Sequence, residues 1–229
     1  MAPTSGARDA QHGIEEITRR FEQGESNLDR WAKLLVASSR RDEEPVRGVA
    51  AWAMGYDASR EEFVARLREM LASDPSVLVR RNAACSLAKS ADACGREVLR
   101  SMLGAYTLPS PGAGVVSGLV AEGVPVRENG VTCKLLLDDG AVAEVRSPVA
   151  GFVLKRVATA GVRVAAGDTL LVLGPDAKHA LNGAYGLLLV GTKDDIETLD
   201  LAAAPQSQFG DDVKTAARQA AEAIRARGK

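Results

Sequence analysis

The chain has 229 residues, of which 46% are hydrophobic and 26% charged, so its composition is that of a folded protein and excludes wholesale disorder. Its 29 basic and 30 acidic residues leave a formal net charge of −1, which provides no overall positive field to attract nucleic acid or an anionic membrane. Aromatic residues make up only 4%, so alanine, leucine and valine must supply most of the core, and small side chains favour closely packed helices.

The N-terminal residues 1–12 are polar and predict a disordered lead without the apolar run of a signal peptide. No other stretch is apolar over the length that a membrane span requires, so we expect no membrane span in this chain. The sequence therefore predicts a cytoplasmic protein. The alternative is a periplasmic or membrane-anchored protein whose leader has been removed.

Apolar residues recur at helical intervals from residue 13 to residue 106. The pattern Val-Arg-x-x-Ala-Ala occurs at 46–51 and again, 33 residues later, at 79–84. Between the copies, residues 59–62 have the spacing of a capping box and predict a helix start. Asp74 and Pro75 predict an N-cap and a first-turn proline for the next helix. A helix–turn–helix unit of this period is typical of a stacked solenoid.

The helical pattern stops near residue 106 and returns over residues 176–229, where Thr192 and Asp195 suit the start of a helix. A looser third copy of the Val-Arg pattern lies at 213–218. With these copies the sequence resembles HEAT-repeat proteins, whose repeats carry this element in their second helix. The resemblance covers 13–106 and 176–229 and implies an α solenoid that binds other proteins along an extended surface.

The same family often has an aspartate six residues before the arginine, which bonds across to the next repeat. Asp74 and Arg80 have this spacing. Arg47 is preceded at that offset by Arg41, so the resemblance implies an incomplete ladder.

Between the helical blocks, residues 107–175 alternate glycine, valine and proline in short runs, which predicts a small β domain. The segment is duplicated internally. Residues 110–116 match 147–153 at an offset of 37, and both halves end in strand-like runs. We expect two quasi-repeats, 110–137 and 147–173, whose valine faces are buried against each other.

The runs 146–151 (Arg-Ser-Pro-Val-Ala-Gly) and 164–170 (Val-Ala-Ala-Gly-Asp-Thr-Leu) give this segment a close resemblance to the biotinyl/lipoyl-carrier family. That family folds as a barrel-sandwich hybrid of two pseudo-symmetric halves and carries its modified lysine at the hairpin that joins them. Here the joint reads Leu-Asp-Asp-Gly-Ala-Val over 137–142 and offers no amine. Lys134 lies inside the preceding strand, and we do not expect it to be modified. The sequence thus predicts a lipoyl-like module that has lost its attachment lysine and binds no cofactor.

The joint itself is the one candidate contact surface: Asp138, Asp139 and Gly140, in which Asp-Gly suits a tight two-residue hairpin. Relatives present their cofactor at this place. We expect no catalytic residue and no metal ligand. The two histidines, His12 and His179, stand at no ligand spacing to a cysteine. Cys85 and Cys133 are expected as buried free thiols.

Together these features predict an α+β multidomain protein, an α-helical HEAT-like solenoid interrupted by a small all-β barrel-sandwich hybrid. The expected function is that of a non-enzymatic scaffold or adaptor with other proteins as partners and no nucleic acid. HEAT-like DNA glycosylases use a basic channel, which the neutral charge balance disfavours. Two alternatives stay open: an extracytoplasmic adaptor subunit of an efflux or secretion system, and a degenerate, non-carrying component of a biotin- or lipoyl-dependent enzyme complex.

Overall fold

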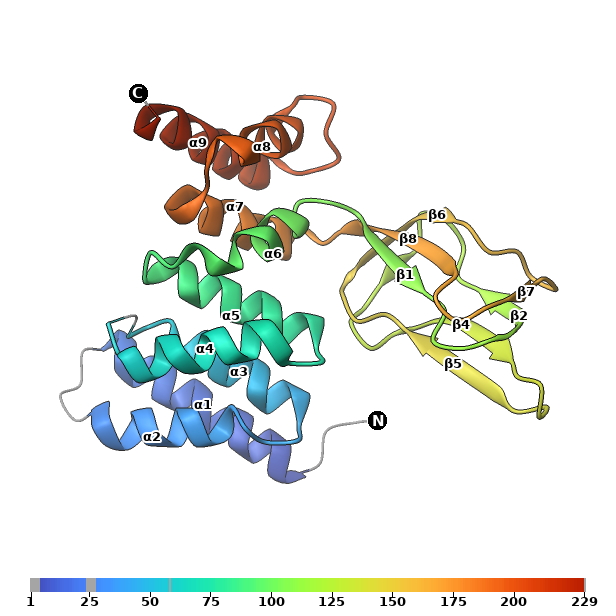
Figure 1. Ribbon diagram of the computed structural model, residues 1–229, viewed down its shortest axis with the longest axis horizontal. Helices are drawn as coiled ribbons and strands as arrows, with labels where there is room; N and C mark the ends of the chain where they lie inside the picture. Colours follow the sequence, from blue (N-terminus) through green and yellow to red (C-terminus); the bar gives the residue numbers. More distant parts are fainter. Residues whose placement is uncertain (1–4, 24–27, 58, 229) are drawn as a thin grey trace. The chain divides into compact units, whose positions relative to one another are not determined.

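The structure is a computed structural model that describes residues 5–23, 28–57 and 59–228 (Figure 1). The chain divides into two compact units. The first, here called the helical unit, consists of Met1–Arg100 together with Asn182–Lys229. The second, the β unit, is the intervening segment Ser101–Leu181. The helical unit is thus assembled from two separate stretches of chain.

The helices follow one another in chain order as α1 (Ser5–Glu22), α2 (Leu28–Ser38), α3 (Glu44–Met54), α4 (Glu61–Ser73), α5 (Val77–Lys89), α6 (Arg96–Ser101), α7 (Ala177–Val190), α8 (Ile196–Ala203) and α9 (Asp211–Arg227). Short 3-10 turns, η1 (Ala93–Gly95) and η2 (Lys193–Asp195), precede α6 and α8. The first helix begins at Ser5, well before the start at residue 13 that the sequence suggested; residues 1–4 of the expected lead lie outside the described residues.

Eight strands form two four-stranded antiparallel sheets in the described part of the β unit. The strands are β1 (Tyr106–Pro109), β2 (Gly114–Leu119), β3 (Pro125–Val126), β4 (Val131–Leu136), β5 (Val142–Arg146), β6 (Gly151–Arg156), β7 (Arg163–Val164) and β8 (Thr169–Pro175). One sheet has the order β1-β8-β6-β3 and the other the order β5-β4-β2-β7. Each half of the chain segment therefore gives two strands to each sheet.

The fold class expected from the sequence, an α-helical solenoid interrupted by a barrel-sandwich hybrid, is wrong. Over the described residues the chain is an α+β protein with nine α-helices and two antiparallel sheets. The helices range from six residues in α6 to eighteen in α1, whereas a stacked solenoid is built from units of one size. The strands pair into two separate sheets, which do not close into a barrel. The two halves of the duplicated sequence contribute corresponding strands to these sheets.

Small residues let α3 and α5 approach closely in the core of the helical unit. Buried alanines cover the facing surfaces of both helices, and a Cβ atom added to Gly55 would lie only 2.5 Å from Ser86 Oγ. The Ser86 hydroxyl donates to the Ala51 carbonyl at 2.8 Å, and Asn82 Nδ2 donates to the Gly48 carbonyl at 2.9 Å. Both polar side chains thus gain a backbone partner at the contact, as buried groups must.

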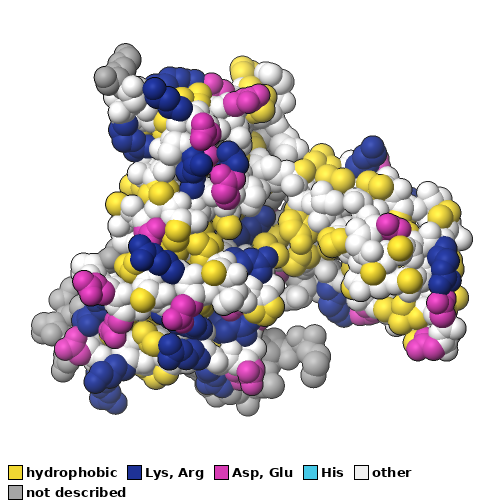
Figure 2. Space-filling view, viewed as in Figure 1, with side chains coloured by type: hydrophobic (Ala, Val, Ile, Leu, Met, Phe, Trp, Pro, Cys, Tyr) yellow, Lys and Arg dark blue, Asp and Glu magenta, His cyan; other side chains and the backbone are white. Residues whose placement is uncertain are grey.

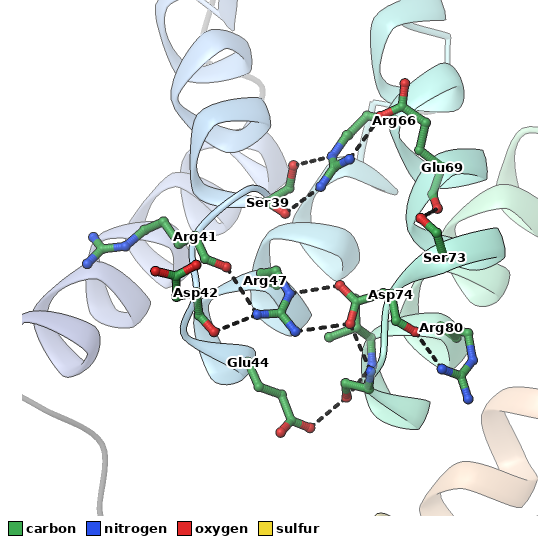
Figure 3. A network of polar contacts seen from close by, with 12 residues as sticks. Ser39, Arg41, Asp42, Glu44, Arg47, Arg66, Glu69, Ser73, Asp74 and Arg80 are labelled. Carbon is green, nitrogen blue, oxygen red and sulfur yellow. Dashed lines mark hydrogen bonds and ion pairs between the residues drawn. The ribbon is translucent and has the colours of Figure 1, made fainter.

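Arg47 and Asp74 form a bidentate ion pair at one end of this helix pair (Figure 3). The Arg47 guanidinium donates to both Asp74 carboxylate oxygens, at 2.8 and 3.0 Å, and the two side chains are only 12% and 5% exposed. Hydrogen bonding to Asp74 raises the pKa of Arg47. A planar guanidinium fits a carboxylate in this fork geometry, and so the pair fixes the start of α3 to the loop between α4 and α5.

The two copies of the Val-Arg pattern make the same backbone contact. Arg47 Nη1 donates to the carbonyl of Arg41, six residues earlier, and Arg80 Nη1 donates to the carbonyl of Asp74, again six residues earlier. The 33-residue echo therefore reflects a shared way of closing the turn before each helix (Figure 3). Two such turns are a local motif and do not make a solenoid.

The two helix starts predicted from capping patterns at residues 59–62 and 74–75 are wrong in detail. The N-cap of α4 is Arg60, without a side-chain bond, and the Ser59 hydroxyl donates instead to Asp57. Asp74 ends α4, while Ser76 caps α5 by accepting from the Val79 N–H at 3.2 Å. The Asp74 carboxylate accepts from both the Arg47 guanidinium and the Ser76 N–H, the latter at 2.9 Å, so it supports the N-cap residue without being the N-cap itself.

The returning chain segment is fixed to the first by Asp195, whose side chain is 0% exposed. Its Oδ2 atom accepts from the Thr192 N–H at 2.8 Å in a complete capping box, which confirms the predicted helix start. Arg96 lies 3.5 Å from Oδ2 and Arg100 3.7 Å from Oδ1. The approach is tight nearby, because a Cβ atom on Gly186 of α7 would lie 2.6 Å from a methyl carbon of Leu99.

The two sheets of the β unit carry matching hydrogen bonds at corresponding turns. Ser110 exchanges backbone bonds with Gly167 and Asp168, and Ser147 exchanges the equivalent bonds with Asn129 and Gly130. Gly167 has φ +87°, and Asn129, at the matching place, has φ +58°. Asparagine is among the few residues that tolerate this left-handed conformation, so one half uses Asn where the other uses Gly.

We expect Asp195→Ala to destabilise the helical unit by about 2–3 kcal/mol, because it removes a capping box and leaves Arg96 and Arg100 without their buried counter-charge. Asp194→Ala is the matched control: its side chain is 74% exposed and it contacts Arg96 at the same 3.5 Å, so a change within about 0.5 kcal/mol is expected. Trp31 and Trp52, the only tryptophans, both lie in the helical unit, so urea unfolding followed by tryptophan fluorescence measures this unit alone. Equal effects of the two substitutions would contradict the role assigned to Asp195.

Candidate functional site

The hairpin between β4 and β5 contains the candidate residues Asp138, Asp139 and Gly140. Leu137 N–H donates to the Ala141 carbonyl at 2.9 Å, so the loop has three residues and not the two predicted. The Gly140 N–H donates to the Leu137 carbonyl at 3.0 Å, and Gly140 has φ +83°. This is a type I turn followed by a left-handed residue, the usual form of a three-residue hairpin.

Both carboxylates of the loop contribute to its rigidity. Asp139 Oδ1 accepts from the Ala141 N–H at 2.9 Å, and Asp138 pairs with Arg163 of β7 at 2.7 Å. The hydrogen bond from the Arg163 guanidinium lowers the pKa of Asp138. Asp138 follows the end of β4, and β2 lies between β4 and β7, so this ion pair reaches across β2.

Two large aliphatic side chains lie exposed directly behind the loop. Leu136 of β4 and Val142 of β5 are cross-strand neighbours, with 43% and 58% of their surface exposed. Val115 of β2 pairs with Leu136, and Arg163 pairs with Val115, so the row of side chains ends on a cation. Figure 2 shows acidic side chains gathered at this end of the β unit, with hydrophobic side chains beside them.

Lys134 lies in β4, opposite Glu144 of β5, and therefore on the strand and not at the hairpin tip. Nearby, a shallow groove of about 220 Å³ is lined by residues of β2, β4 and the adjoining turns: Gly118, Leu119, Val120, Val131, Thr132, Cys133 and Lys134. This volume is below that of a typical small-molecule site. The groove is continuous with the same sheet that carries the hairpin.

The remaining residues singled out from the sequence do not belong to the hairpin. His179 is near the start of α7, where its backbone N–H and its Nδ1 atom both approach the Asp176 carboxylate, and His12 pairs with Glu15 in α1. Over the described residues, His, Cys, Asp and Glu form no group of three or more that could hold a metal ion. None of the described helices has the length and hydropathy that a bilayer crossing requires.

The three cysteines are free thiols in different surroundings. Cys85 and Cys133 are buried, as predicted, and burial raises the pKa of both, that of Cys85 to about 12. Cys94 is exposed, and partial desolvation together with the neighbouring Asp92 carboxylate raises its pKa to about 11. All three thiols are therefore protonated, and poorly nucleophilic, near neutral pH.

The sequence located the hairpin but missed the apolar pair behind it. Leu136 belongs to the apolar run 135–137, and its pairing with Val142 in the register of β4 against β5 places both side chains on the exposed face. The signal that could have revealed them is the alternation of Val142, Glu144 and Arg146, which share one face of the strand.

No family model matches the chain, and no curated protein does. Among solved structures, the chain is similar to one described as a "single-chain, multi-domain long-chain acyl-CoA carboxylase". The similarity has 25% sequence identity and a TM-score of 0.31, and it covers 32% of this chain and 7% of that one. At this TM-score the likeness establishes neither a shared fold nor a shared activity.

The Asp138 carboxyl should titrate below the ordinary aspartate value of about 3.9 in the folded protein, because it accepts from Arg163. In Arg163→Ala its pKa should rise towards that value, as followed by carboxyl-carbon NMR. Since the folded-state pKa is the lower one, the contribution to stability is present above the unfolded pKa and is lost as the pH falls through the folded pKa. A titration that does not respond to Arg163→Ala would exclude this ion pair in solution.

Alkylation of the native protein at pH 8 should modify Cys94 first, because Cys85 and Cys133 are buried. Cys94 should itself react more slowly than a free peptide thiol, roughly a hundredfold if its thiolate fraction controls the rate. Peptide mass spectrometry after timed iodoacetamide treatment measures the three rates, and urea-unfolded protein is the control in which they converge. Native Cys85 reacting as fast as Cys94 would disprove its burial.

Proposed function

We propose that this chain is a non-enzymatic adaptor that binds another protein through the hairpin end of its β unit. The contact surface consists of the loop Asp138–Gly140 and the apolar pair Leu136 and Val142. The observation that carries the proposal is this exposed pair, two aliphatic neighbours set directly beside a rigid acidic loop.

The surface of Leu136 and Val142 that stays exposed gives no stability to this fold, yet its burial in a contact with a partner would be favourable. The loop beside them is already fixed by the Asp139–Ala141 hydrogen bond, the Gly140 turn and the Asp138–Arg163 pair. A partner would therefore meet a surface that loses little conformational entropy on binding.

The side chains on this surface indicate what kind of partner it would bind. An apolar centre with a charged rim is the usual arrangement of a protein contact, in which the centre supplies affinity and the rim selects the partner. The carboxylates of Asp138 and Asp139 favour a partner that presents an apolar patch bordered by lysine or arginine.

Quantitative affinity purification from the native source tests the proposal, with the full chain as bait. Leu136→Ser/Val142→Thr should reduce the recovery of specific partners at least tenfold relative to wild type, since a tenfold change is only about 1.4 kcal/mol. Asp138→Asn/Asp139→Asn should reduce it less, and more strongly at low ionic strength.

Leu154→Ser is the matched control, because Leu154 is 41% exposed and lies in β6 of the other sheet. This variant should retain every partner. Circular dichroism and thermal unfolding check that all variants are folded. If the hairpin variants and Leu154→Ser recover the same proteins in the same amounts as wild type, the hairpin is not the binding surface.

A further inference from the structure

The outer strands of the two sheets differ in how well they are protected. Among the described residues these are β1, β3, β5 and β7. Strands β3 and β7 have two residues each, and β1 has four and ends in Pro109. Proteins protect sheet edges by short strands and by proline, which cannot donate a hydrogen bond. With five residues and no proline, β5 lacks both protections.

The free hydrogen-bonding groups of β5 follow from bonds at its two ends. The Ala141 carbonyl accepts from the Leu137 N–H, and the Ser147 N–H donates to the Gly130 carbonyl. Ala141 and Ser147 therefore face β4. Because successive residues of a strand point their backbone groups to opposite sides, Val142, Glu144 and Arg146 point theirs outward. The row ends with β5 at Arg146.

The charges on this edge can pair with the opposite charges of a second, antiparallel copy of the same edge. Glu144 and Arg146 are exposed, at 43% and 45%, and contact each other across two positions of the strand. An antiparallel second copy with its two-fold axis at Glu144 would set like charges face to face. With the axis at Val145, Glu144 of each copy lies opposite Arg146 of the other, and opposite charges in cross-strand pairs are favourable.

The second register also satisfies the backbone. Glu144 and Arg146 are both outward residues, so each cross-strand pair exchanges two N–H to carbonyl hydrogen bonds, and symmetry repeats the pair. The two ion pairs within the chains, one in each copy, are exchanged for two between the chains.

We propose that the chain self-associates through β5, with two copies paired antiparallel about Val145 so that the β5-β4-β2-β7 sheets form one continuous sheet. The inference is independent of the proposed partner-binding function, because it rests on the strand edge and its charges and not on the hairpin loop.

Sedimentation velocity of the full chain over a wide concentration range tests this association. Wild type should show a dimer that increases with concentration. Glu144→Arg and Arg146→Glu should each weaken it at least tenfold, since each places like charges opposite one another. The charge swap Glu144→Arg/Arg146→Glu should restore affinity to within about threefold of wild type, because both pairs form again with reversed sign.

Two further variants separate the edge from general effects. Glu144→Pro removes an outward N–H but no bond to β4, and should abolish the dimer. Lys155→Glu, an exposed charge reversal in β6 of the other sheet, should leave it unchanged. A wild type that stays monomeric at all concentrations, a dimer indifferent to the single reversals, or a swap that fails to restore it would each overturn the proposal.

Discussion

The buried carboxylate of Asp195 is the point at which the two chain segments of the helical unit meet. Arg96 and Arg100 come from the first segment, and Asp195 and its Thr192 capping partner come from the second. The entropic cost of closing a loop grows only slowly with its length, so the segment 101–181 can be a whole folded unit without a large penalty. This requires that the two ends of the segment are kept together. The Asp195 carboxylate does this, because a charge with 0% exposure is stable only when its counter-charges lie beside it.

The helical unit also depends on small residues, which let its helices approach one another closely. Alanines fill the contact between α3 and α5, and Gly55 and Gly186 stand where any Cβ atom would collide with a neighbouring side chain. The few aromatic residues of the chain are thus compensated by packing at short range, since dispersion contacts accumulate when backbones come near. The polar groups at these contacts, from Ser86 to the Arg47–Asp74 pair, then fix the relative position of the helices.

In the β unit, the two halves of the duplicated sequence make matching backbone contacts. Corresponding turns at Ser110 and Ser147 make equivalent hydrogen bonds, and Asn129 takes the left-handed conformation that Gly167 takes in the other half. Each sheet of the β unit also has two edge strands. The edge at β5 and the hairpin beside it carry the features from which the two proposals were drawn: an exposed apolar pair, a rigid acidic loop and a self-complementary row of charges.

Local features of this protein were determined by the sequence alone. The approximate positions of most helices, the helix start at Thr192 and Asp195, and the location of the turn at Asp138–Gly140, though not its length, follow from short-range patterns, because each depends on neighbouring residues. Tertiary structure decided the rest. The helices and strands did not assemble into the expected class of fold, and the Asp74 carboxylate was bound by Arg47 of another helix. Each of these outcomes depends on contacts between residues far apart in the chain, and a local pattern carries no information about which of those contacts will form.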